Sequence, residues 1–222
     1  MKLHYFEGST TCRPIVMLAK EAGIELELVP VDLMAGEHVG PAYTAVNPNQ
    51  LVPVLEDGDF RLTEGSAILK YLADVADSPA YPKDLKARAR VNERMDWFNT
   101  GLSRELCYGT VYPRILSYMG YEDAAVQAAV TGRASEKAKR LLGILNDHML
   151  TDAGPYLGGA EPDLSDFLGI AYVTLAEMVR QDFSAHPRIA RWIAAMRGRP
   201  SWPVAHTGFE GWRDYVLSQS AA

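Results

Sequence analysis

The chain has 222 residues, of which 48% are hydrophobic and 23% charged, and this length can bury one large core or two small ones. Its formal net charge at pH 7 is −6, whereas proteins that bind nucleic acids usually present a basic face. The five histidines are scattered, without histidine or cysteine neighbours at the spacing of metal ligands. We therefore expect no nucleic-acid partner and no metal.

Two features of the sequence bear on the location of the protein. The N-terminal residues contain no apolar segment of signal-peptide length, and the most apolar later stretch, residues 167–179, contains Glu177 and is too short to span a bilayer. Two cysteines, Cys12 and Cys107, are too few for a disulfide framework. We predict a cytoplasmic protein with reduced thiols and no membrane contact.

The first residues alternate between strand and helix patterns. Residues 2–6 and 25–31 are predicted strands, and Pro30 favours a sheet edge for the second because proline has no N–H to donate. Between them we expect a helix that ends at Gly23. Its apolar residues recur at helical spacing, at Ile15, Leu18, Ala19 and Ala22.

A hairpin and a second helix follow. Residues 52–55 and 60–63 flank Asp57-Gly58, a pair typical of tight β-turns. A helix beginning near Glu64 is expected to bury Ala67, Ile68, Tyr71, Leu72 and Val75. The order βαβ, loop, ββα predicts an α/β domain with a mixed sheet over residues 1–76.

Residues 77–84 include two prolines without hydrophobic periodicity, and they are predicted to be a linker to an all-helical domain, residues 85–222. A first long helix is predicted to end near Pro113, and a second to cover residues 122–150. The apolar stripe of the first consists of Ala87, Val91, Met95, Phe98, Leu102 and Leu106. Asp163 and Asp166 have the spacing of a helix-capping box, a later helix starts at Pro187, and the tail around Trp212 and Tyr215 is a candidate for one more.

Several motifs resemble those of cytosolic glutathione transferases. VPVL (52–55), LTEGSAILKYLAD (62–74) and the Asp163/Asp166 pair are similar to that superfamily's cis-proline hairpin, glutathione-binding turn and capping box. Four further segments resemble the theta class: STTCR, VDLMAGEH, VNPNQLVPVLEDGDFRLTE and YPKDLKARARV. Glu64-Gly65 is also similar to the bacterial beta class. The resemblance weakens beyond residue 110, and it implies a thioredoxin-like N-terminal domain, glutathione as co-substrate and a homodimer.

Ser9 is the candidate catalytic residue. Glutathione attacks as a thiolate, and lowering a thiol pKa of about 8.5 by about two units requires roughly 2.7 kcal/mol. A hydroxyl hydrogen bond to a charged group contributes about 1.5–3 kcal/mol and a helix N-terminus about 0.3–1 kcal/mol. By resemblance, Ser9 matches the theta-class serine that donates to the sulfur. The alternative is that Ser9 or Thr10 only caps the helix that follows.

Cys12 is a competing candidate for the catalytic residue. A cysteine near a helix N-terminus can have a lowered pKa, and family members with a cysteine at this end perform thiol exchange. However, Cys12 lies two or three positions after the beta-class cysteine and matches a non-catalytic cysteine that is common in theta sequences. We expect a partly buried thiol with a packing role.

The remaining glutathione contacts follow from the resemblance. Val52 precedes Pro53, whose peptide bond is expected to be cis, so the Val52 backbone would pair with the cysteinyl residue as an added strand. Glu64 would accept from the γ-glutamyl ammonium, and the N–H groups of Gly65 and Ser66 would bind the γ-glutamyl carboxylate at a helix start. Most family members have serine in place of Gly65, so one hydroxyl contact is missing.

The glycyl end of glutathione is assigned to a neighbouring loop. His38 matches the histidine of the theta-class GQH loop, although a loop histidine can also be simply solvated. Gln50 and Leu51 stand where theta enzymes often have a lysine, so Gln50 and His38 would have to hold the glycyl carboxylate.

Arg104, Tyr108 and Tyr112 recur at i, i+4 and i+8, on a face that lines the electrophile pocket or contacts a partner subunit. Tyr108 stands where some theta enzymes have a substrate-directed arginine, which argues against anionic substrates such as sulfate esters. We predict a glutathione S-transferase that acts on small hydrophobic electrophiles such as alkyl halides or epoxides. The alternatives are a glutathione-dependent thiol/disulfide redox enzyme using Cys12, and a non-catalytic binding protein.

Overall fold

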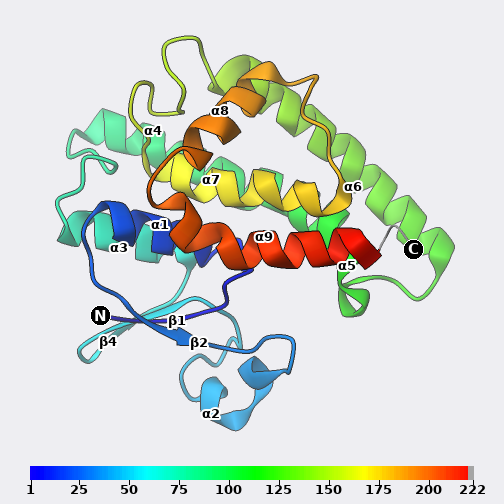
Figure 1. Ribbon diagram of the computed structural model, residues 1–222, viewed down its shortest axis with the longest axis horizontal. Helices are drawn as coiled ribbons and strands as arrows, with labels where there is room; N and C mark the ends of the chain where they lie inside the picture. Colours follow the sequence, from blue (N-terminus) through cyan, green and yellow to red (C-terminus); the bar gives the residue numbers. More distant parts are fainter. Residues whose placement is uncertain (220–222) are drawn as a thin grey trace.

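The computed structural model describes residues 1–219, and it has a four-stranded sheet beside a larger group of helices (Figure 1). The strand order is β2-β1-β3-β4, in which β1 pairs parallel with β2 and antiparallel with β3, so the sheet is mixed as predicted. The elements of this part are β1 (Lys2–Tyr5), α1 (Arg13–Glu21), β2 (Glu27–Pro30), α2 (Pro41–Thr44), β3 (Val54–Asp57), β4 (Phe60–Leu62) and α3 (Gly65–Val75).

Two local predictions for this sheet are confirmed. Strand β2 ends at Pro30 and lies at the edge of the sheet, where the missing N–H breaks no ladder. The β3–β4 hairpin turns at Gly58, whose φ of 62° favours glycine because it has no Cβ.

The buried face of α3 differs from the predicted one. Ile68 and Leu72 are fully buried as expected, but Val75 is 51% exposed, and Leu69 and Ala73 are buried in its place. Helix α3 contacts both α1 and α7, so its buried surface is turned toward the side of Leu69 and Ala73. The sequence pattern alone did not indicate this second contact.

The rest of the chain is helical. Its helices are α4 (Leu85–Asp96), the π-helical segment η2 (Trp97–Val111), α5 (Tyr112–Ile115), α6 (Ala124–Ile144), α7 (Leu164–Leu175), α8 (Pro187–Arg197) and α9 (Trp202–Gln219). Shorter helical segments are η1 (Glu37–Val39), η3 (Ser117–Met119), η4 (Leu145–Met149) and η5 (Ala176–Val179). The first long helix predicted from the sequence is the continuous run of α4, η2 and α5, although Ala87 at its start is exposed.

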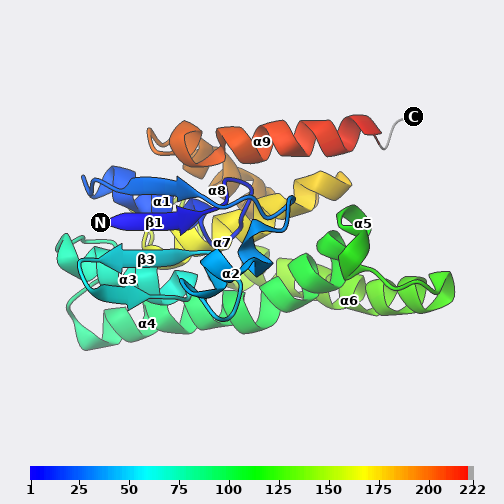
Figure 2. The same ribbon diagram turned by 90° about the horizontal axis from the view of Figure 1, so that it is seen from below.

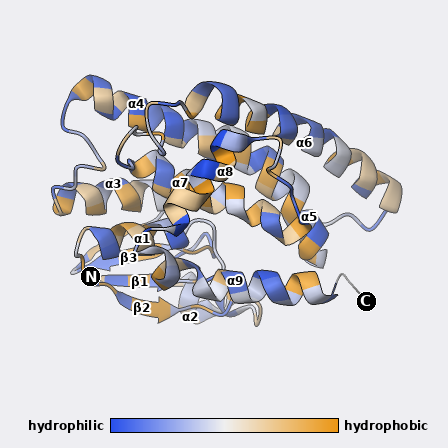
Figure 3. Cartoon of the chain, turned by 45° about the horizontal axis from the view of Figure 1, so that its top comes forward, coloured by the Kyte–Doolittle hydropathy of each residue, from blue (hydrophilic) through white to orange (hydrophobic). Residues whose placement is uncertain are grey.

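Helix α7 lies at the centre, between α1 and α9 on one side and α4, η2 and α6 on the other (Figure 2). All twelve of its residues are buried, whereas hydrophilic and hydrophobic residues alternate along the outer helices α6 and α9 (Figure 3). Its start is fixed by the predicted capping box, because Asp163 accepts from the Ser165 N–H and Asp166 accepts from the Asp163 N–H, at 2.8 and 2.9 Å.

A buried arginine joins α1 to the helical part. Arg13 is 1% exposed and donates to the Ala171 carbonyl oxygen at 2.9 Å and to the Thr174 hydroxyl at 3.4 Å, both on α7. Its guanidinium lies 3.8 Å from the ring centroid of Phe209 on α9. Helix α1 is therefore held directly beyond the turn that contains Ser9.

No helix within residues 1–219 has both the length and the apolar character needed to cross a bilayer.

Candidate active site

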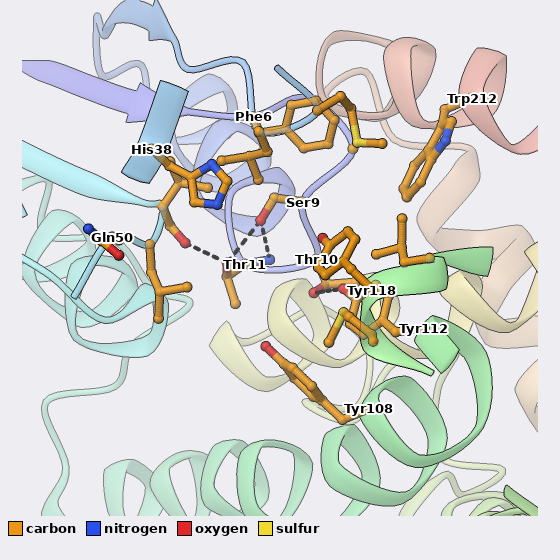
Figure 4. Close-up of a pocket in the computed structure, with 17 residues that line it drawn as sticks. Phe6, Ser9, Thr10, Thr11, His38, Gln50, Tyr108, Tyr112, Tyr118 and Trp212 are labelled. Atoms are coloured by element: carbon orange, nitrogen blue, oxygen red, sulfur yellow. Dashed lines mark hydrogen bonds between the residues drawn. The ribbon is translucent and has the colours of Figure 1, made fainter. Parts of the chain in front are cut away.

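A cavity of about 250 Å³ opens between the turn after β1, the loop before Pro53 and the helical part (Figure 4). Residues 8–11 form one wall, and residues 50–52 and His38 form the second. The remaining side is closed by Tyr108, Tyr112, Leu116, Tyr118, Met119 and Trp212. The cavity therefore lies where the two parts of the chain meet, with Ser9 on its wall.

The Ser9 hydroxyl is held by the backbone of its own turn. Its Oγ accepts from the N–H groups of Thr11 and Cys12, at 3.2 and 3.3 Å. It also lies 2.9 Å from the Thr11 hydroxyl. The two N–H groups occupy both lone pairs of the Ser9 oxygen, and they polarise its O–H bond and make it a better donor. The Thr11 hydroxyl uses its own hydrogen on the Val52 carbonyl oxygen, so the Ser9 hydrogen is donated to the Thr11 oxygen, from which it can rotate to a ligand in the cavity.

The two residues after Ser9 attach its turn to both sides of the cavity. The Thr10 hydroxyl lies 3.0 Å from the Tyr112 hydroxyl of the helical part. The Thr11 hydroxyl donates to the Val52 carbonyl oxygen at 3.3 Å, next to Pro53. These hydrogen bonds fix Ser9 relative to the surfaces on which a ligand would lie.

Cys12 is fully buried, and burial raises its pKa to about 11, although hydrogen bonds from Ser9 and Thr11 and the charge of Arg13 act in the opposite direction. The thiol is therefore protonated at neutral pH and has no access to solvent. This environment does not suit a nucleophile.

The Val52–Pro53 peptide bond is cis, as the motif predicts. The Leu51 carbonyl oxygen accepts from the Tyr43 hydroxyl and the Asn47 amide, at 2.9 and 2.7 Å, which leaves Val52 to present the backbone at the cavity. Gln50 lines the same wall with a φ of 58°, and its amide donates to the Thr44 hydroxyl at 3.1 Å.

His38 lies on η1 and lines the cavity near Gln50 (Figure 4). Its Nδ1 is buried and has no hydrogen-bond partner within residues 1–219. A buried ring nitrogen without a partner is costly, so Nδ1 disfavours this arrangement of the ring.

Glu64, Gly65 and Ser66 lie outside the cavity wall but adjoin the Ser9 turn. A Cβ placed on Gly65 would lie 3.1 Å from the Thr11 carbonyl oxygen and 3.2 Å from its Cβ, so the first residue of α3 packs closely against this turn. Glu64 precedes α3 with a φ of 65°, and its side chain is exposed without a partner within residues 1–219. A larger residue than glycine at position 65 would therefore crowd Thr11.

The three predicted pocket residues are divided between two places. Tyr108 and Tyr112 line the cavity, with ring centroids 5.2 Å apart, and burial is the main cause that raises the pKa of the Tyr112 hydroxyl. Arg104 does not line the cavity. It lies in a neighbouring groove on the other side of Tyr108.

Sequence reasoning did not identify several lining residues. Phe6 and Trp212 meet edge-on, with ring centroids 6.2 Å apart, and Tyr118 and Met119 also line the cavity. These residues come from three separate segments, and no spacing in the sequence connects them. Among residues 1–219, no cluster of three or more side chains is arranged to hold a metal ion.

Comparison with known proteins gives a consistent result. Residues 1–74 match the family model for the glutathione S-transferase N-terminal domain. Glutathione S-transferase theta-1 of Bos taurus is 37% identical over 208 residues, which cover 89% of this chain and 84% of the relative. The structure of human glutathione transferase theta-2, in complex with glutathione, is 28% identical with a TM-score of 0.84, over 98% and 90% of the two chains.

A delta-class glutathione transferase of Nilaparvata lugens is similar over 98% of both chains, with 28% identity and a TM-score of 0.83. The fold and the site together define a thioredoxin-like enzyme with an added helical domain. The chain belongs to the glutathione S-transferase family, with theta-class proteins among its similar relatives. It is therefore a glutathione transferase with glutathione as its co-substrate.

Proposed function

We propose that Ser9 donates its hydroxyl hydrogen to the sulfur of glutathione and holds it as a thiolate for attack on a small hydrophobic electrophile. The observation that supports this role is the position of the Ser9 hydroxyl on the cavity wall, where two backbone N–H groups hold its oxygen. Its hydrogen, donated to the Thr11 oxygen in the structure, would rotate to the sulfur. Cys12, three residues later, is buried and protonated, which argues against the redox alternative.

Glutathione would lie along the wall formed by the Ser9 turn and the loop before Pro53. The Val52 backbone would pair with the cysteinyl residue, and the Thr11 hydroxyl would release the Val52 carbonyl oxygen as the peptide binds. The place of His38 on the cavity wall supports a contact with the glycyl carboxylate, with Gln50 beside it. Leu51 would cover the peptide from outside.

The γ-glutamyl group would extend past Thr11 to the start of α3. Its carboxylate would accept from the N–H groups of Gly65 and Ser66, which have no intrahelical acceptor at a helix start. Glu64 has a free carboxylate for the ammonium. The close approach of Gly65 to Thr11 supports this path, because it brings the two ends of the site together.

The electrophile would occupy the part of the cavity beside Tyr108, Tyr112 and Trp212. These aromatic side chains, with Leu116 and Met119, favour an apolar ligand of modest size such as an alkyl halide or an epoxide.

The proposed role of Ser9 is tested by Ser9→Ala. We expect the wild-type kcat/KM to rise with pH at an apparent pKa about two units below that of free glutathione, and this pKa to return toward ~8.5 in the variant. Losing about 1.5–3 kcal/mol would lower the rate at pH 6.5 roughly 10- to 100-fold. Stopped-flow conjugation between pH 5.5 and 9 measures both, and an unchanged rate at neutral pH would exclude this mechanism.

We also propose that the protein is a homodimer. Phe60 on the edge strand β4 is 46% exposed and lies with its ring centroid 5.4 Å from that of Tyr71, so an aromatic pair faces outward at the sheet edge. Sedimentation of wild type and Phe60→Glu tests this proposal, since the charged variant should shift toward the monomer. The expected cytoplasmic location and the absence of a metal stay predictions.

A further inference from the structure

An open groove of about 570 Å³ lies next to the active-site cavity, between η2 and the first half of α6. Arg104, Arg133 and Lys137 line it together with one carboxylate, that of Glu105. We call this the basic groove. Three cations and one anion leave two positive charges in excess (three minus one), in a chain whose formal net charge is −6.

The charges of the basic groove are only partly neutralised. The Glu105 carboxylate is 10% exposed and accepts from Arg104 at 3.0 Å and from Lys137 at 3.3 Å, so one anion is shared by two cations. Arg133 is exposed and makes no hydrogen bond or ion pair within residues 1–219. Its guanidinium therefore retains its full capacity to bind an anion.

The basic groove and the cavity have two wall residues in common. Tyr108 and Met119 line both, so the groove adjoins the hydrophobic cavity at these two side chains. Tyr108 is 57% exposed, and Figure 4 shows its hydroxyl end directed toward the cavity. An electrophile with an anionic end would then have its reactive carbon beside Ser9 and its charge beside Arg133.

We propose that the basic groove is an extension of the electrophile site that recognises an anionic group, such as a carboxylate, carried a few atoms from the reactive carbon. This inference rests on the proposed function of the cavity and specifies its substrate class further. Tyr108 occupies the position where an arginine would make the cavity itself attractive to anions. In this protein the cations lie in the groove beyond Tyr108. A short anionic substrate would therefore not reach them, whereas a longer one would form an ion pair there.

Two matched electrophiles test the proposal: N-(4-chloromethylbenzoyl)glycine and its glycinamide, which differ in charge but scarcely in shape. In both, the sulfur of glutathione forms a bond to the benzylic carbon, chloride leaves with the electron pair of the broken bond, and the thiol proton passes to solvent. Both electrophiles react with the same bound glutathione. The ratio of their two kcat/KM values therefore cancels any effect of a substitution on the binding or ionisation of glutathione. We expect this ratio to exceed one and to fall as salt is raised from about 0.02 to 0.5 M.

Arg133→Gln and Lys137→Gln should each lower this ratio roughly two- to fivefold, the usual effect of a partly exposed ion pair. Lys139→Gln is the matched control, because Lys139 lies on the same helix, pairs with Glu136 and does not line the groove. An unchanged ratio in Arg133→Gln, or an equal fall in Lys139→Gln, would overturn the proposal. Rates for the neutral glycinamide should be the same in all four proteins.

If the proposed function of the cavity is wrong, neither electrophile will be conjugated to glutathione above the spontaneous rate. The groove is then tested by calorimetry with the two finished glutathione conjugates, prepared chemically. Tighter binding of the carboxylate conjugate, lost in Arg133→Gln and kept in Lys139→Gln, would support the groove without turnover. Equal affinities of wild type and Arg133→Gln for the carboxylate conjugate would overturn it.

Discussion

Ser9 and Cys12 lie three residues apart in one turn, but they differ in exposure and therefore in reactivity. Ser9 lines the cavity, while Cys12 is fully buried and has a raised pKa. The Cys12 backbone N–H, rather than its thiol, contributes to the site by donating to the Ser9 oxygen at 3.3 Å. Of these two side chains, only that of Ser9 lies on the cavity wall, which agrees with the role proposed for it.

Cys12→Ala should leave kcat/KM within about twofold of wild type. The pKa of about 11 keeps the thiol neutral below pH 9, so native protein at pH 8 should react with iodoacetamide far more slowly than protein unfolded in urea. Mass spectrometry of the labelled cysteines measures this difference. Rapid labelling of native Cys12, with loss of activity in the alanine variant, would favour the redox alternative.

At the scale of the element, the active-site turn depends on a helix from the other half of the chain. Tyr112 lies at the start of α5, directly after η2, and its hydroxyl pairs with that of Thr10. Thr10 is 5% exposed, so water cannot replace this partner readily. The position of Ser9 thus depends on the helical part as well as on β1 and α1.

Tyr112→Phe should lower the free energy of unfolding by about 1–2 kcal/mol, because it leaves the buried Thr10 hydroxyl without its partner. Urea denaturation measures the loss. Thr10→Val added to this variant should cost little more, since the two groups form one interaction. Tyr118→Phe is the control, because Tyr118 is 75% exposed and makes no hydrogen bond within residues 1–219, and an equal loss there would contradict the argument.

At the scale of the whole molecule, a buried polar group lies where the two parts meet. His206 on α9 is fully buried, its ring is stacked 3.6 Å from that of Trp202, and its Nε2 has no partner within residues 1–219. Burial, with Arg13 as a further cause, lowers the pKa of His206 to about 2. The imidazole is therefore neutral in the folded protein.

This lowered pKa predicts a loss of stability in acid. The unfolded chain binds a proton at His206 below pH ~6.5 and the folded chain does not, so the contribution is complete above this pH and falls as pH decreases. The slope is about 1.4 kcal/mol per pH unit. Urea unfolding at pH 7, 6 and 5 should show a shallower decline in His206→Phe than in wild type. His148→Gln, an exposed control, should keep the wild-type slope.

The sequence was informative wherever a local rule determines the structure. Proline at a sheet edge, Asp57-Gly58 in a hairpin and the Asp163/Asp166 box depend on nearby backbone, and each occurs as predicted. The α3 pattern was less informative, because its buried face depends on contact with α7, about a hundred residues later. The same limit applied to Arg104, whose helical spacing with Tyr108 did not reveal that it lines a neighbouring groove and not the cavity.

The family, the mixed sheet, the cis-proline motif and Ser9 as a candidate could all be inferred from the sequence, because each depends on a short segment whose residues are close in the chain. The full burial of Cys12, the place of Trp212 on the cavity wall and the groove beside Arg133 became apparent in the folded chain. The burial and the charged surroundings of these side chains depend on contacts with helices that are distant in the sequence. The spacing of residues within one segment does not indicate which helices pack against it.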